Sequence, residues 1–78
     1  MNGTVLGYVE VYPTHFSDHI TIYTDCVETQ HYEVYNALGS MVAEGDYNGS
    51  VDVDTDRFIP GSYMVKTVGK VVRLIKSK

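Results

Sequence analysis

Apolar and polar residues alternate over short stretches along most of the chain, which is the spacing of half-buried β-strands. Between His19 and Thr24, for example, Ile20 and Ile22 point to one face and the residues between them to the other. Gly, Asn and Asp interrupt each stretch before an amphipathic helix could form. The pattern predicts strands over residues 6–12, 19–24, 32–36, 41–44, 51–54, 62–67 and 71–76.

Turn-forming residues separate these stretches. Pro13 ends the first strand because it has no amide proton for a ladder. The segment 25–30 is polar and predicts a loop. Asn36–Gly39 predicts a tight turn in which Gly39 takes a positive φ. A further turn is expected over residues 45–49, and an apolar corner over Phe58–Gly61.

About seven short strands separated by regular turns predict an all-β fold, a small immunoglobulin-like β-sandwich of mostly antiparallel strands. A small barrel is the alternative. A chain of 78 residues is one domain, and every strand must contribute to one shared core. We expect this domain over residues 9–78, with residues 1–8 as a start or linker segment and the beginning of the first strand.

Acidic residues outnumber basic ones by ten to six, which gives a formal net charge of −4. This balance argues against binding of nucleic acids and of anionic membranes, which both require basic surfaces. No apolar run approaches the roughly 20 residues of a membrane span, so no direct membrane insertion is expected. Met1–Thr4 has no features of a signal peptide, so the protein is either cytoplasmic or a piece of a longer exported chain. Cys26 is the only cysteine, which excludes an internal disulfide.

The alternating acids Asp52, Asp54 and Asp56 are similar to the start of a calcium-binding loop. The glycine and glutamate that such a loop requires at its sixth and twelfth positions are replaced by Arg57 and Tyr63. We therefore interpret the acids as the solvent-facing side of a strand that runs into an aspartate turn.

Other residues with chemical potential are scattered. His15, His19 and His31 could gather around zinc with Cys26, but they lack the close spacing of structural zinc ligands. Ser17–His19 contains the residue types of a catalytic triad, which sequence neighbours rarely form. We expect no catalytic, cofactor-binding or metal-binding residues and no enzymatic activity.

Four segments follow one another in an order typical of a known family. The opening combines Val11–Pro13, Phe16–Asp18 and Ile20–Ile22, and the later segments are Tyr32–Val42, Pro60–Lys66 and Val71–Lys76. Together they resemble the C-terminal sorting domain of the type IX secretion system (Por secretion tail, type A) over about Val9–Lys78. The family's asparagine-proline after the first proline is replaced here by Thr14–His15.

This resemblance implies a β-sandwich at the end of a large exported protein of a Bacteroidetes-type bacterium, so Met1 would be an artificial start. An outer-membrane translocon would recognise the domain once the cargo reaches the periplasm. A sortase-like peptidase would then remove it and leave the cargo at the cell surface or outside the cell. The domain would be a passive substrate without a cofactor.

The resemblance also implies which residues carry sorting or recognition. Gly39 and Gly61 are expected to permit turns, Tyr63 to fill the core, and the last strand with Lys76 and Lys78 to offer strand edge and charge to a partner. Removal of residues 75–78 is expected to block export of a folded domain. The full set of sorting-motif residues is Pro13, Asn36, Gly39, Gly61, Tyr63, Arg73, Ile75, Lys76 and Lys78.

A second hypothesis belongs to a different functional class, an immunoglobulin-like adhesion or carbohydrate-binding accessory module. Sugar-binding sandwiches present exposed aromatic platforms, and tyrosine is abundant in this chain. The candidate platform residues are Tyr8, Tyr12, Tyr23, Tyr35 and Tyr47.

Overall fold

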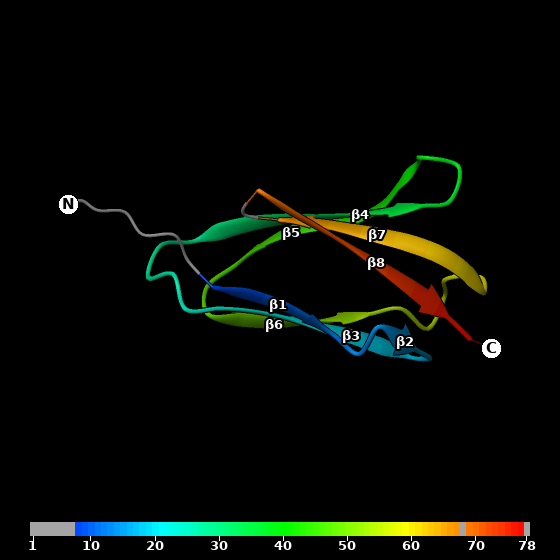
Figure 1. Ribbon diagram of the computed structural model, residues 1–78, viewed down its shortest axis with the longest axis horizontal. Coiled ribbons are helices and arrows are strands. Elements are labelled where there is room, and N and C mark those ends of the chain that lie inside the picture. The colour runs from blue at the N-terminus through cyan, green and yellow to red at the C-terminus, as the bar shows by residue number, and fades with distance from the viewer. Residues whose placement is uncertain (1–7, 68, 78) are drawn as a thin grey trace.

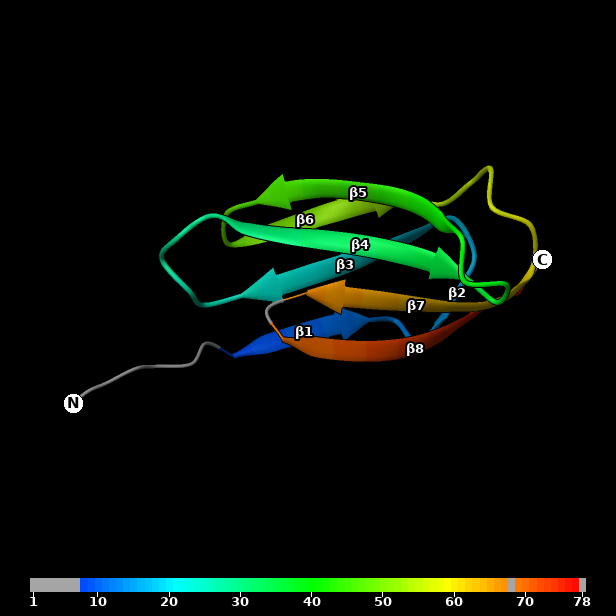
Figure 2. The same cartoon turned by 90° about the horizontal axis from the view of Figure 1, so that it is seen from above.

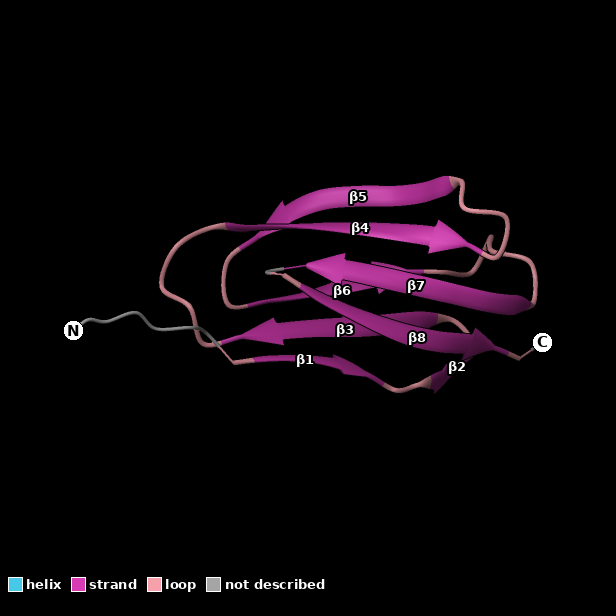
Figure 3. Cartoon of the chain, turned by 45° about the horizontal axis from the view of Figure 1, so that its top comes forward, coloured by secondary structure: helices cyan, strands magenta, loops and turns pink. Residues whose placement is uncertain are grey.

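The computed structural model describes residues 8–67 and 69–77, and within them the chain forms eight strands and no helix (Figures 1 and 3). Consequently no helix in this part of the chain could cross a membrane. The strands are β1 Val9–Tyr12, β2 His15–Phe16, β3 His19–Thr24, β4 Gln30–Asn36, β5 Met41–Tyr47, β6 Ser50–Asp54, β7 Gly61–Thr67 and β8 Lys70–Lys76.

The strands form two sheets that pack face to face (Figure 1). One sheet has the order β1-β3-β6 and the other the order β2-β8-β7-β4-β5. All pairings are antiparallel except the short parallel pair of β2 and β8. Seen from above, β8 lies over β1 and β5 lies over β6 (Figure 2). The predicted all-β sandwich of mostly antiparallel strands is confirmed.

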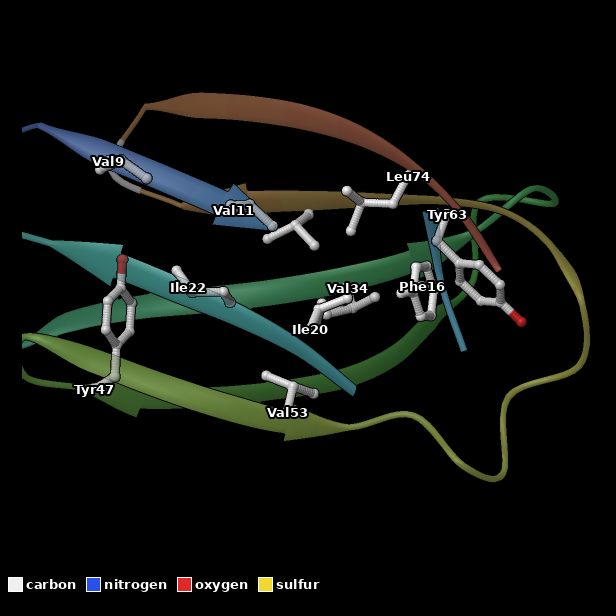
Figure 4. Close-up of a cluster of buried hydrophobic side chains, with 11 residues drawn as sticks. Val9, Val11, Phe16, Ile20, Ile22, Val34, Tyr47, Val53, Tyr63 and Leu74 are labelled. Atoms are coloured by element: carbon white, nitrogen blue, oxygen red, sulfur yellow. The ribbon is translucent and has the colours of Figure 1, made fainter. Parts of the chain in front are cut away.

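A single core fills the space between the sheets, and each of the eight strands contributes to it (Figure 4). The predicted alternation holds in β3, where Ile20 and Ile22 are fully buried. Together the buried apolar residues are Val9, Val11, Phe16, Ile20, Ile22, Val34, Tyr47, Val53, Tyr63, Val65 and Leu74. This is the shared core that a domain of this length requires.

Strand β2 was not predicted, so the structure has eight strands rather than about seven. It contains only His15 and Phe16, which is too short to produce a recognisable alternation. After Pro13 the chain leaves the sheet of β1 and joins the edge of β8. Phe16 inserts into the core with 2% of its surface exposed.

Strand β5 continues through Gly45 and Asp46, where a turn was expected, and that part of the prediction is wrong. Gly45 pairs with Tyr32 on β4, and a Cβ atom at Gly45 would lie 3.0 Å from the tyrosine ring. Glycine is needed here because the aromatic ring covers the strand, not because the chain turns. The reversal is confined to the residues around Asn48 and Gly49.

The remaining boundaries differ by a few residues. β4 begins at Gln30, within the expected loop 25–30. β1 begins at Val9, and the predicted strand residues 6 and 7 lie outside the described residues.

Candidate functional site

Motif residues that are far apart in the sequence meet at one end of the sandwich. There β4 ends, β7 begins and β8 ends, so Asn36 pairs with Tyr63 and Gly61 pairs with Lys76. We call this region the motif end; it also includes the 36–40 hairpin and the 58–60 corner. In Figure 1 it is the end marked by the C-terminus, opposite the start of β1. Motifs that are separate in the sequence are thus adjacent in the fold.

Tyr63 holds the corner between β6 and β7. Its hydroxyl donates a hydrogen bond of 2.5 Å to the carbonyl oxygen of Ile59. The ring stacks on Phe58 at 5.1 Å and meets Phe16 edge-on at 5.9 Å between centroids. Burial raises the pKa of Tyr63, and only 3% of the residue is exposed. This is the tyrosine corner of immunoglobulin-like sandwiches, and it gives Tyr63 the core position expected of it.

Asn36 and Gly39 form the β4–β5 hairpin. The side-chain oxygen of Asn36 accepts hydrogen bonds from the backbone nitrogens of Leu38 and Ser40, each 3.0 Å long. Gly39 has the expected positive φ, +86°, and its nitrogen donates to the carbonyl oxygen of Asn36. Both motif residues therefore shape the turn, and the side chain that projects from it is Leu38.

Lys76 is turned inward. Only 6% of it is exposed, its ammonium group donates to the carbonyl oxygen of Ser17, and its nitrogen lies 5.8 Å from the centroid of the Phe16 ring. The backbone nitrogen of Ser77 then donates to the carbonyl oxygen of Phe16. The charge of Lys76 is thus used inside the fold to fasten β2 to β8. Lys78 lies outside the described residues.

Large apolar side chains are exposed to solvent at the motif end. Leu38 in the hairpin is 89% exposed, Ile59 in the corner 75%, and Ile75 on β8 47%. Arg73 is exposed on β8 and borders a shallow groove with Ala37 and Ser62. The sequence analysis named Arg73 and Ile75 as candidate recognition residues, but not Leu38 and Ile59. In the sequence, Leu38 and Ile59 are apolar residues beside turn formers, a position in which burial is not expected.

The free edge of β8 is a further feature beside the motif end. β2 covers this edge only at Ile75 and Lys76. In the described part of the chain no strand pairs with the remaining stretch, residues 70–74, on that side. Pro13 lies where the chain arrives at this edge, and the next residue, Thr14, accepts a hydrogen bond from the nitrogen of Ile75. An open edge of this kind can accept a strand from another chain.

The aspartates of β6 have the structural role expected of them. Asp52 accepts a hydrogen bond of 2.8 Å from the Thr21 hydroxyl on the outer face of the three-stranded sheet. The carboxylate of Asp54 accepts one of 2.9 Å from the nitrogen of Asp56, which forms an aspartate turn. β3 begins at His19, so Ser17 and Asp18 lie in the short turn between β2 and β3.

The predicted tyrosine platform is not a single surface. Tyr47 is 5% exposed and its hydroxyl lies 2.9 Å from the Thr67 hydroxyl, so its prediction as a platform residue is wrong. Tyr8 and Tyr23 meet edge-on at 6.2 Å and are exposed on the three-stranded sheet, as is Tyr12. Tyr35 belongs to the other sheet.

Comparison with known proteins assigns the family. Residues 10–77 match the family model of the secretion system C-terminal sorting domain, a non-catalytic sorting signal. No curated protein and no solved structure matches the chain. The match covers nearly all strands of the sandwich and all motif residues except Lys78. The chain therefore belongs to the family of C-terminal sorting domains that direct cargo proteins through the type IX secretion system.

Proposed function

We propose that the outer-membrane translocon recognises this domain at the motif end, through Leu38, Ile59 and Ile75 together with Arg73. The domain directs the export of the secreted cargo protein of which it is a part. The observation that carries the proposal is the gathering of exposed apolar side chains where the family's motifs meet.

The fold itself does not require these exposed side chains. The hairpin needs the side chain of Asn36 and the glycine at position 39, while Leu38 contributes only backbone. In the corner, Ile59 holds Tyr63 through its carbonyl oxygen while its side chain projects into solvent. Several exposed apolar residues beside an arginine are typical of protein-binding surfaces. A partner that buries them gains hydrophobic free energy that the isolated domain does not use.

The free edge of β8 supplies a second mode of contact. A strand of the translocon that paired with residues 70–74 would extend the five-stranded sheet next to the motif end. Backbone pairing of this kind is independent of sequence, so the side chains of the motif end would provide the specificity.

We further propose the later steps of sorting on the basis of family membership. The cargo passes through the periplasm, crosses the outer membrane and is delivered to the cell surface or the medium. A sortase-like peptidase removes the domain on the way. The motif residues Pro13, Asn36, Gly39, Gly61 and Tyr63 act by shaping the recognised end and Arg73 and Ile75 by touching the partner.

The central test uses residues 1–78 fused behind a periplasmic reporter in a host that has a type IX secretion system. We expect the double variant Leu38→Ser/Ile59→Ser to leave the reporter in the periplasm, because the recognised apolar surface is lost. Val27→Ser is the matched control, since Val27 is as exposed as Leu38, at 89%, but lies in the loop before β4 at the opposite end. Protease accessibility of the reporter on intact cells measures export.

Circular dichroism of the isolated variants shows whether they remain folded. Export of a folded Leu38→Ser/Ile59→Ser fusion at the wild-type level would contradict recognition through the motif end. Retention of the Val27→Ser fusion as well would indicate a general response to surface polarity, and would equally count against the proposal.

The role of Arg73 is tested by reversing its charge. We expect Arg73→Glu to reduce export at least tenfold, because an acidic group would replace the exposed cation beside the groove. Lys66→Glu makes the same change of charge on the same face of the sheet, farther from the motif end, and should export normally. Equal export of both variants would exclude Arg73 from the contact surface.

Removal of the domain is tested with an epitope tag placed after Lys78. We expect exported reporter to have lost the tag while reporter retained in the periplasm still carries it. Surface reporter that keeps the tag quantitatively would contradict proteolytic removal, without affecting the recognition step.

A further inference from the structure

Four acceptor side chains form a square on the outer face of the five-stranded sheet, away from the motif end. Glu33 on β4 pairs directly with Glu44 on β5, and His31 pairs directly with Asp46. Like charges in directly opposed positions destabilise a pair of strands. A cation between the two strands would therefore relieve the repulsion between Glu33 and Glu44.

The imidazole of His31 has a defined orientation. Its Nδ1 lies 2.8 Å from Oδ1 of Asp46, and because a carboxylate only accepts, Nδ1 carries the proton. In the neutral ring, Nε2 then presents its lone pair. Nε2 lies 3.5 Å from Oε2 of Glu33 and 3.5 Å from Oε1 of Glu44. Three acceptor atoms thus converge. The carboxylate of Asp46 fixes the orientation of the imidazole through the other ring nitrogen, as carboxylates do for metal-binding histidines.

Glu33 is oriented by a second contact of the same kind. The Tyr35 hydroxyl donates a hydrogen bond of 2.6 Å to Oε1 of Glu33, which leaves Oε2 directed towards His31. Lys66 is the neighbour of Glu33 on β7, yet it makes no ion pair within 4 Å with any carboxylate in the described part of the chain. The converging atoms therefore lack a bound side-chain cation.

We propose that His31, Glu33 and Glu44 bind a divalent transition metal ion, for which Zn²⁺ is the probe. The ligand atoms of the three residues lie within 4.8 Å of one another. In tetrahedral zinc sites with bonds of about 2.0–2.1 Å, ligand atoms stand about 3.3 Å apart, close to both distances from Nε2. Imidazole nitrogen and carboxylate oxygen are both ligands that zinc accepts in proteins. The site is open to solvent, which leaves a fourth position for water.

A proton is the competing occupant. The hydrogen bond that His31 donates to Asp46, together with the negative charges of Asp46, Glu33 and Glu44, raises the pKa of His31, so an imidazolium is the alternative to a metal between the carboxylates. Metal and proton compete for the same Nε2 lone pair, and the metal requires the neutral ring.

The site connects the edge strand β5 to the interior strand β4. A bound ion would secure this edge without a contribution from the core. Since the ion binds the folded chain in preference to the unfolded one, it should raise the melting temperature.

The test is titration of the purified 78-residue chain with zinc chloride at pH 8, in competition with a chromophoric chelator. We expect one zinc ion per chain and an increase in melting temperature of several degrees. His31→Gln and Glu44→Gln should each weaken binding at least tenfold, and Tyr35→Phe about tenfold because it releases Glu33. His19→Gln is the matched control: His19 also bonds an aspartate, but in the other sheet, and its loss should leave affinity unchanged.

Nuclear magnetic resonance distinguishes this site from binding elsewhere. The Nε2 resonance of His31 should shift on addition of zinc, and that of His19 should not. Absence of saturable binding would overturn the proposal. So would unchanged affinity in a folded His31→Gln or Glu44→Gln variant, or equal loss in His19→Gln. Because these measurements need no secretion system, their outcome is separate from that of the export experiments.

Discussion

At the scale of single residues, Gly45 shows how a side chain on one strand determines the residue on the next. The ring of Tyr32 lies where a side chain of residue 45 would begin, and it also packs against Tyr47 at 6.1 Å between centroids. A glycine in this position signals close approach in a strand, although in the sequence it resembles a turn former.

We expect Gly45→Val to lower the free energy of unfolding by about 1–3 kcal/mol, because the new side chain displaces the Tyr32 ring. In a Tyr32→Ala background the same substitution should be neutral or stabilising, since valine favours strands. Urea denaturation of the four proteins measures this coupling. Equal effects in both backgrounds would show that the ring is not the reason for the glycine.

Asp18 gives a prediction for the dependence of stability on pH. Its carboxylate lies 2.9 Å from Nδ1 of His19, and this hydrogen bond lowers the pKa of Asp18 from its ordinary value of 3.8. A depressed pKa in the folded state stabilises the fold above the unfolded value, and this contribution is lost as pH falls through the folded value. The stability difference between wild type and Asp18→Asn should therefore be present at pH 6 and decrease as the pH falls below 3.8.

Urea midpoints at pH 6, 4 and 3 measure that difference. Glu28→Gln, a neutralisation in the exposed loop before β4, controls for the change in net charge. A difference that grows as the solution becomes more acidic would contradict the assigned hydrogen bond.

At the scale of elements, the short strand β2 depends on the last residues of the described chain. Ile75 and Ser77 donate backbone hydrogen bonds to Thr14 and Phe16, and the Lys76 ammonium binds the Ser17 carbonyl oxygen. Residues 75–77 hold β2 in place, so we now expect that removal of residues 75–78 also destabilises the domain.

We predict that deletion of residues 75–78 lowers the free energy of unfolding by at least about 2 kcal/mol, through lost hydrogen bonds and exposure of Phe16. Lys76→Met, which keeps the aliphatic stem, should cost only about 1 kcal/mol. Thermal and urea denaturation of both variants provide the comparison. A deletion variant as stable as the full chain would show that β2 stays in place without β8's end.

The sequence predicted most elements because their alternation and turn chemistry are local. Ile20 and Ile22 marked β3, and the Asn36–Gly39 turn was expected together with its positive φ. β2 was not predictable, since two residues have no period. The motif end could be reached only in part: Arg73 and Ile75 came from family resemblance, whereas Leu38 and Ile59 became visible once distant turns were brought together. The inward position of Lys76 depends on Phe16 and Ser17, about sixty residues away.

At the scale of the whole molecule, one core joins both sheets, so no part of the described chain has a hydrophobic cluster of its own. We expect two-state unfolding, with coincident transitions by far-ultraviolet circular dichroism and by tyrosine fluorescence. Val34→Ala, which truncates a residue 1% exposed at the centre of the core, should shift both transitions together. Separate transitions would indicate that the two sheets unfold independently.

The motif end and the start of β1 lie at opposite ends of the sandwich (Figure 1). Cargo joined before β1 is therefore attached at the end opposite the surface that we propose the translocon binds. The sandwich separates the cargo from the proposed recognition surface, so the translocon can reach this surface whether the cargo is large or small. This arrangement allows the same sorting domain to serve different cargo proteins, because a change of cargo does not require a change in the recognition surface.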